Sequence, residues 1–518
     1  MPNAKTDRAR GRLGSLGLAT VVLGVCFVLT FGVAAAGANT YGLSSPVVDV
    51  STGPDPFATC TADNVADQMT FSDLYPNAEP EPRADVNPTN PSNIVGAYHE
   101  DRWDRFGGNR GLVSSATHDG GAHWNKVVVP GITKCSDGIF DRASDPWVSF
   151  APNGKLYGIW LVFDVFDSHN GVLVSTSANG GDSWSDPVPL IVDDTNGNDK
   201  QSITADPYNA NNVYAVWDRF LSPPGGLHAS DTGRFHARSY VQQIFFSRTT
   251  NGGASWEPAR VIYNPGTQNF TIGSIINVLP NATHDLVDVF GEGATQGGKS
   301  RSADIAAIRS TDHGVTWSKK ASVVAPLDLS FGGPYDPDNN RPIRSGGLPD
   351  ATVDPVSGRL YVVWEDDTTQ PGIDEIRFSQ SSDGGITWSD PVKINKTPTN
   401  IAPGNQQAFT PTVKVAADGT VGVTYYDLRE NTPAPGLPTD YWLVHCHSAC
   451  TNAVSWAESK VAGPFDEEQA AFARGYFVGD YQGLVTIGNT FGAFFGQAVS
   501  RAADNPSDVY YTTLSPTP

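Results

Sequence analysis

The sequence predicts an all-β fold, a β-propeller with four-stranded antiparallel blades, from three observations. No sustained apolar stripe with a 3.6-residue period runs through the chain. Short runs rich in Val, Ile, Tyr and Phe alternate instead with Gly, Pro, Asn and Asp. A box of the form S/T-x-D/N-x-G-x-x-W also occurs five times, ending at Trp124, Trp184, Trp256, Trp317 and Trp388. Repeated β units whose closure hides most sheet edges are typical of a propeller.

Each box is expected to form a hairpin turn with its own anchor. The Asp or Asn can cap turn amides, and the Gly two residues later tolerates a positive φ. The Trp at the end is free to pack beneath the turn. A fixed box at near-regular intervals therefore predicts one supersecondary unit repeated along the chain.

The number of units favours seven blades over six. Five units end after the boxes, a sixth near 406–463 keeps Trp456, and the tail from Phe472 supplies only three strands. The missing outer strand would come from the segment before Glu79. We therefore expect residues 39–78 to close the ring and residues 79–518 to form the propeller.

The first 38 residues resemble a secretory signal. Four basic residues precede an uncharged stretch, from Leu13 to Ala38, that finishes AAAGA. This predicts a secreted, extracellular protein. The apolar stretch is also long enough for the alternative, an uncleaved anchor at the cell surface, since a span needs about 20 apolar residues.

Charge and cysteine content narrow the partners and the compartment. The formal net charge of −21 argues against nucleic acid or an anionic membrane as the main partner. We expect a monomer. Outside the signal, four cysteines suggest disulfides in an exported chain, Cys60 with Cys135 and Cys446 with Cys450. A metal site at the run HCHSAC is the alternative for the second pair.

Propeller geometry sorts residues by face. With strands a to d running outward from the axis, the boxes lie on one face, and the opposite face receives the starts of the a strands and the long loops after the b strands. Acidic, basic and aromatic side chains meet there, as acidic-sugar recognition requires. The candidates are His99, Arg102, Arg142, Asp145, Asp218, Arg219, Arg344, Glu365, Arg429 and Tyr476, beside Asp199, Lys200, Arg474 and Asp480. For each of them, pairing with neighbours or loop backbone is the structural alternative.

The boxes resemble the Asp-box (BNR) repeats of the sialidase-like propeller superfamily, and the resemblance covers Glu79 to the C-terminus. It implies an exo-glycosidase acting on the end of an acidic glycan, with no required cofactor. Its residues would be an arginine triad on the sugar carboxylate, an acid/base, a tyrosine nucleophile and a glutamate partner. On this chain these roles fall to Arg142, Arg219 and Arg344, then Asp145, Tyr476 and Glu365.

Two features depart from the sialidase pattern. EPRADVNP stands where sialidases have F/Y-R-I-P, and seven units are counted where sialidases have six. A propeller lyase that cuts rhamnose from glucuronate is therefore one alternative, with His99 moving the proton and Arg219 neutralising the carboxylate. A non-catalytic propeller that binds a glycan or a protein is another.

A bound cation is compatible with the sequence. Acidic clusters such as WEDD, which begins at Trp364, could hold Ca²⁺. A dense ligand loop of the D-x-D-x-D type is not present in the sequence.

Overall fold

The structure is a computed structural model that describes residues 40–63, 68–221, 241–296, 299–327, 333–499 and 505–517. These ranges contain thirty-two strands and four short 3-10 helices. The predicted signal at 1–38 lies outside them. No helix in these ranges combines the length and the hydropathy needed to span a bilayer.

Four sheets each contain four consecutive antiparallel strands. The first holds β12 (Gly197–Ala205), β13 (Val213–Leu221), β14 (Val241–Thr249) and β15 (Arg260–Tyr263). The second holds β16 (Asn269–Val278), β17 (Leu286–Gln296), β18 (Lys299–Ser310) and β19 (Ser322–Leu327). The third holds β20 (Asp350–Val353), β21 (Leu360–Asp366), β22 (Glu375–Ser381) and β23 (Val392–Lys393). The fourth holds β24 (Ala408–Val415), β25 (Val421–Asp427), β26 (Pro438–Cys446) and β27 (Ala457–Asp466).

Two further units of this kind are joined in a nine-stranded sheet. One contains β4 (Arg83–Val86), β5 (Ile94–Trp103), β6 (Asn109–Thr117) and β7 (Asn125–Val128), with β3 (Leu74–Tyr75) added beside β5. The other contains β8 (Arg142–Phe150), β9 (Leu156–Phe163), β10 (Asn170–Ser177) and β11 (Val188–Asp193). A single pair, Asn109 with Ala143, links β6 to β8.

The last sheet brings the two chain ends together. It contains β30 (Gly483–Ile487), β31 (Thr490–Ala498) and β32 (Ser507–Thr517), with β1 (Thr40–Leu43) and β2 (Val48–Asp49) both paired to β32. Thr40 lies opposite Thr517 in this ladder. The N-terminal segment therefore supplies the outer strand that the three-strand tail lacks.

The remaining elements are short. A two-stranded sheet pairs β28 (Ala471–Phe472) with β29 (Tyr476–Phe477). The 3-10 helices are η1 (Lys134–Ser136), η2 (Pro403–Gln406), η3 (Ala453–Ser455) and η4 (Glu467–Gln469).

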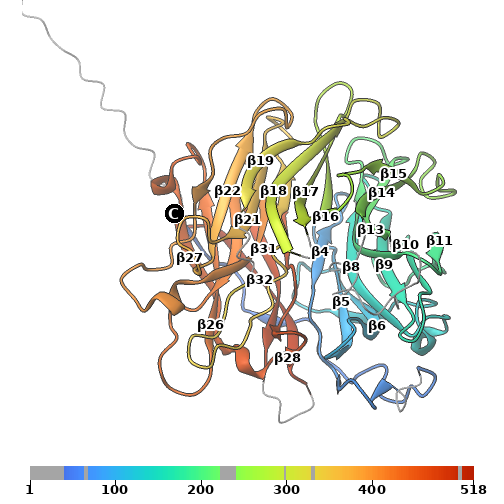
Figure 1. The fold of residues 1–518 in the computed structure, drawn as a ribbon, viewed down its shortest axis with the longest axis horizontal. Helices are drawn as coiled ribbons and strands as arrows, with labels where there is room; N and C mark the ends of the chain where they lie inside the picture. The colour runs from blue at the N-terminus through green and yellow to red at the C-terminus, as the bar shows by residue number, and fades with distance from the viewer. Residues whose placement is uncertain are drawn as a thin grey trace, which may run out of the picture. The chain divides into compact units, whose positions relative to one another are not determined.

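The first strands of these units contact one another in a closed order: β4, β8, β12, β16, β20, β24, β30 and again β4. Figure 1 shows β4, from the N-terminal part of the chain, alongside β8. Four-stranded antiparallel units arranged in this way form a β-propeller, which confirms the predicted fold class. Because the first two units share one hydrogen-bonded sheet, the count of seven blades stays a prediction.

The core lies between neighbouring sheets, and it repeats with the units. Trp160, Trp217 and Trp364 occupy the second strands of three units, and each is at most 1% exposed. Buried aliphatic and aromatic side chains of adjacent units pack around them. Repeated burial of this kind holds each sheet against the next.

The five boxes form the same turn. In the first, Gly121 N donates to Thr117 Oγ1 and His123 N donates to Asp119 Oδ1, both at 3.0 Å. The equivalent two bonds occur in the other four boxes. The indole of Trp184 reaches the preceding unit and donates to Ser114 Oγ at 2.8 Å. That box thus ties one sheet to its neighbour.

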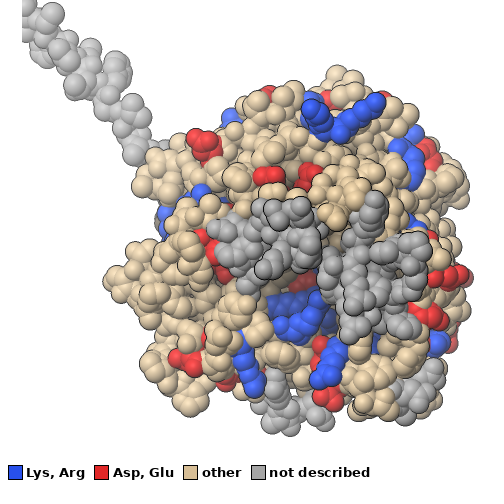
Figure 2. All heavy atoms as spheres, in the orientation of Figure 1, with Lys and Arg blue, Asp and Glu red and all other residues tan. Residues whose placement is uncertain are grey.

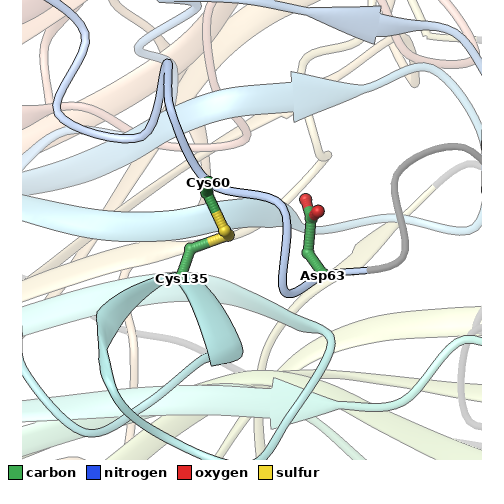
Figure 3. A group of neighbouring side chains, drawn as sticks. All are labelled: Cys60, Asp63 and Cys135. Carbon is green, nitrogen blue, oxygen red and sulfur yellow. A yellow bond between two sulfur atoms is a disulfide. The ribbon is translucent and has the colours of Figure 1, made fainter.

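Both predicted disulfides are confirmed. Cys60 is bonded to Cys135, and Cys446 is bonded to Cys450. Figure 3 shows the first bond, with Asp63 on the same N-terminal segment as Cys60. Since both sulfurs are in the disulfide, this trio is not a thiolate metal site. The carboxylate of Asp63 instead lies 2.7 Å from Arg110 Nε.

Candidate functional site

A charged cavity of about 400 Å³ opens where the first strands begin and the second strands end. This is the face opposite the boxes. Figure 2 shows basic side chains in a hollow of the face in view, with acidic side chains nearby. The charged residues that line the cavity are Arg102, Lys200, Arg344, Arg474, Asp145, Asp199, Glu365 and Asp480.

Irregular starts of the first strands aim several of these side chains inward. Glu81, Asp145 and Lys200 have φ values of 59°, 52° and 46°, which are uncommon for residues other than Gly. The ladder shifts register at Asp145 in β8 and at Lys200 in β12. A bulge of this kind re-aims a side chain. Each of the three residues lies two positions before the regular part of its strand, so the repeat places them at equivalent points.

A buried ion network joins residues from five parts of the chain. Lys200 Nζ lies 2.5 Å from Asp145 Oδ1, 2.7 Å from Asp480 Oδ2 and 3.3 Å from Glu81 Oε1. Arg344 forms a two-pronged pair with Asp480, at 2.8 Å through Nε and 2.5 Å through its terminal nitrogen. Buried charges are tolerated because they are paired in this way.

Three arginines gather at one side of the cavity. The guanidiniums of Arg102 and Arg344 lie over the ring of Phe477, at 5.0 Å and 4.1 Å from its centroid. Burial, assisted by the charge of Arg344, lowers the pKa of Arg102 to about 9. Arg474 is exposed and, within the described part of the chain, forms no ion pair. The nearby charge of Arg344 is the main cause that lowers the pKa of Arg474. This crowding favours a bound anion.

Two carboxyl groups in the cavity have raised pKa values. Burial raises the pKa of Glu365 to about 7, although its carboxylate accepts hydrogen bonds from the Ser345 hydroxyl and from Thr410 N at 3.0 Å. Burial and then repulsion from Glu81 raise the pKa of Asp145 to about 6, against the attraction of Lys200. Values close to neutrality suit proton transfer.

His99 supports the site from behind. It is fully buried, and the lining of the cavity does not include it. Its Nε2 accepts a hydrogen bond from Asp145 N at 3.1 Å and lies 2.7 Å from Glu81 Oε2. Burial lowers the pKa of His99 well below its usual range and raises that of Glu81. Burial therefore disfavours a charge on either member of this pair.

The floor of the cavity is narrow. The space below it holds only about 20 Å³ and shares Lys200 and Asp480 with the cavity. Arg83 crosses this space, paired with Asp350 at 3.2 Å and lying 3.8 Å from the ring centroid of Trp147. The cavity is thus closed below, which suits the end of a chain better than a chain passing through.

The expected arginine triad is not assembled, because Arg344 lines the cavity and Arg142 and Arg219 do not. Arg142 is fully buried and donates to backbone carbonyls of the loop after β5. Arg219 donates to Asp193, and Arg429 pairs with carboxylates in its own sheet, as close as 2.6 Å. Local partners hold all three guanidiniums away from the cavity, and Arg102 and Arg474 stand beside Arg344 instead.

Asp218 and Tyr476 also lie outside the cavity lining. Asp218 is fully buried and accepts hydrogen bonds from Thr271 Oγ1 and Gly273 N, both at 2.8 Å. The phenol of Tyr476 donates to Glu468 at 3.4 Å. Among the described residues that line the cavity there is no tyrosine, so the predicted nucleophile is not in place.

Glu81 is the residue that sequence reasoning missed. In EPRADV it was treated only as a departure from a family motif. Its signal is the alignment of Glu81-Pro-Arg with Asp145-Pro-Trp at the starts of two first strands. The repeat itself could have identified it.

Comparisons with known proteins give distant structural similarity only. No family model and no curated protein matches the chain. The Hadza microbial sialidase Hz136 is 15% identical, covering 78% of this chain and 73% of its own, with a TM-score of 0.44. An α-L-arabinanase of Penicillium chrysogenum is 14% identical, covering 67% and 88%, at 0.43. The leech intramolecular trans-sialidase is 10% identical, covering 92% and 98%, at 0.42. Similarities this weak assign neither substrate nor reaction to this chain.

Proposed function

We propose that this protein is a glycosidase that removes a terminal unit from an acidic glycan. The observation that carries the proposal is the composition of the cavity. Three arginines stand beside two carboxyl groups whose pKa values lie near neutrality, in a space closed below. Arginines can bind an anionic sugar, and two carboxyl groups of this kind can act as an acid–base pair.

The arginines would hold the carboxylate of the sugar. Arg474 is exposed, lines the cavity and forms no ion pair within the described ranges, so its guanidinium would be available to an incoming anion. Arg102 uses one terminal nitrogen on the carbonyl of Gly108, at 2.8 Å. Its buried Nε has no hydrogen-bond partner in the described part of the chain. Planar guanidiniums match a carboxylate with two parallel bonds.

The two carboxyl groups would divide the chemistry. Glu365, with the higher pKa, keeps its proton near neutral pH and would donate it to the glycosidic oxygen as the bond breaks. Asp145 is ionised above about pH 6 and would stabilise the positive charge that develops on the sugar ring. This pair takes over from the tyrosine nucleophile that the sialidase resemblance implied.

The localisation and oligomeric state belong to the same proposal. Two disulfides suit an oxidising compartment, so we expect an extracellular protein. We also expect it to be a monomer. N-terminal sequencing of the exported protein would show cleavage near residue 38, and light scattering would report a single chain. An uncleaved N-terminus would instead indicate an anchored protein.

The test is product analysis with acidic oligosaccharides. We expect release of a free acidic sugar from sialylated or uronate-capped substrates. An unsaturated uronate, detected by its ultraviolet absorbance, would mean elimination and would replace the hydrolase by a lyase. Glycan binding without any product would contradict the proposed activity and would indicate a non-catalytic, glycan-binding propeller.

A further inference from the structure

A second group of acidic side chains lies outside the cavity, where the N-terminal segment packs on the first sheet. One carboxylate oxygen from each of Asp55, Glu100 and Asp101 lies within 4.8 Å of the other two. Asp55 belongs to the segment before β3, and the other two belong to β5. Neighbouring strand residues normally point to opposite faces, but Asp101 has a φ of 67°, which breaks that alternation.

Glu100 carries an oxygen that nothing satisfies. Its side chain is fully buried, and Oε2 lies 3.3 Å from Lys126 Nζ. Within the described ranges, Oε1 has no hydrogen-bond partner. A buried carboxylate oxygen without a donor is costly, so this atom itself indicates a missing ligand.

The surrounding charges do not balance. Lys126 is shared between Glu100 and Glu79, which lies 2.9 Å away. Arg110 is shared between Asp101 and Asp63, which follows Cys60 in the N-terminal segment. Asp55 forms no ion pair within the part of the chain that the structure describes. In the described ranges Lys126 and Arg110 are thus each shared between two acidic partners, and Asp55 lies beside Glu100 and Asp101 without a cation of its own.

We propose that Asp55, Glu100 and Asp101 bind a calcium ion that fastens the N-terminal segment to the first sheet. Calcium takes carboxylate oxygens at about 2.3 to 2.6 Å, so two opposite ligands lie about 4.6 to 5.2 Å apart. Three oxygens that all lie within 4.8 Å of one another are close enough to share one ion of this size. Magnesium, at about 2.0 to 2.1 Å, needs a tighter octahedron.

The ion would act where the segment is already held closely. Phe57, two residues after Asp55, is 2% exposed, and its ring lies 2.3 Å from the place a Cβ on Gly111 would occupy. Gly111 is the ladder partner of Glu100. The ion would therefore connect β5 to the segment that continues to the disulfide at Cys60.

The experiment uses the full exported chain, stripped with EDTA and then dialysed. Calorimetric titration with CaCl₂ should show one ion per chain with a Kd of about 10⁻³ M or tighter, the range of extracellular calcium sites. The thermal midpoint should rise as calcium is added, and MgCl₂ should bind more weakly. These readouts do not depend on glycan turnover.

Two variants locate the site. Asp55→Asn, at the partly exposed member of the trio, should weaken calcium binding by about tenfold or more. Asp164→Asn is the matched control, because Asp164 is also partly exposed and accepts a backbone hydrogen bond but stands outside the trio. It should bind calcium as the natural chain does. No calcium uptake by the natural chain at about 5 mM would overturn the proposal, as would equal affinity in Asp55→Asn. If Asp55→Asn does not fold, the stoichiometry of the natural chain decides.

Discussion

Replacing Lys200 by Met tests the ion network that shapes the cavity. Lys200 Nζ is the shared partner of Asp145, Asp480 and Glu81, all buried to 5% side-chain exposure or less. Methionine keeps most of the volume and removes the charge. Breaking a buried pair by deleting one partner costs about 3 to 5 kcal/mol, because the other charge is left uncompensated. We expect a loss of that size in the free energy of unfolding at neutral pH.

The loss should depend on pH in a defined direction. Without Lys200 the pKa of Asp480, which Arg344 and Lys200 hold well below its usual range, moves upward. The pKa values of Glu81 and Asp145, which are already above their unfolded values, rise further. Such groups support the fold below the unfolded pKa, about 4, and lose that support as the pH rises through the folded pKa. The variant should therefore be less destabilised at about pH 5 than at about pH 8.

Urea unfolding, followed by tryptophan fluorescence at both pH values, measures this difference. Lys320→Met is the control, because Lys320 is exposed, and it should change stability by less than about 0.5 kcal/mol. A Lys200→Met penalty below about 1 kcal/mol, or one independent of pH, would refute the reasoning.

Three further results are expected. In a pH profile of kcat/KM, the rate should be highest between about pH 6 and about pH 7. It should fall at lower pH because Asp145 gains a proton, and at higher pH because Glu365 loses one. A flat profile across this range would exclude both roles. Arg474→Gln should raise KM for an acidic substrate by about tenfold or more without lowering the melting temperature, and an unchanged KM would remove Arg474 from recognition. Cys135→Ser opens a 75-residue loop and should lower the free energy of unfolding, measured with urea, by about 4 kcal/mol. Cys446→Ser opens a four-residue loop and should lower it by about 2 kcal/mol. Equal losses would contradict the loop-entropy account.

The fold could be predicted from sequence because its signals are local and repeated. Each box carries its own turn chemistry, from Asp119 in the first to Asp383 in the last, and the hydrogen bonds follow it. Strand order also predicts that the starts of the first strands and the ends of the second strands share one face, and the predicted residues Asp145, Arg344 and Glu365 all line the cavity there.

The composition of the site could not be predicted residue by residue. Arg142 and Arg344 both stand near strand starts, yet one donates to backbone carbonyls and the other lines the cavity. Which of the two faces the cavity depends on the path of the chain ahead of each first strand, and the residue types at these positions do not determine that path. Asp218 shows the same limit, since its partner Thr271 belongs to the next unit.

The most direct test of the proposed active site compares two buried glutamates. Burial raises the pKa of both, of Glu365 to about 7 and of Glu467 to about 8, but only Glu365 lines the cavity. Turnover of an acidic glycan should fall by about 10²- to 10⁴-fold in Glu365→Gln and stay near the natural rate in Glu467→Gln. Undiminished turnover in a folded Glu365→Gln variant would contradict the account.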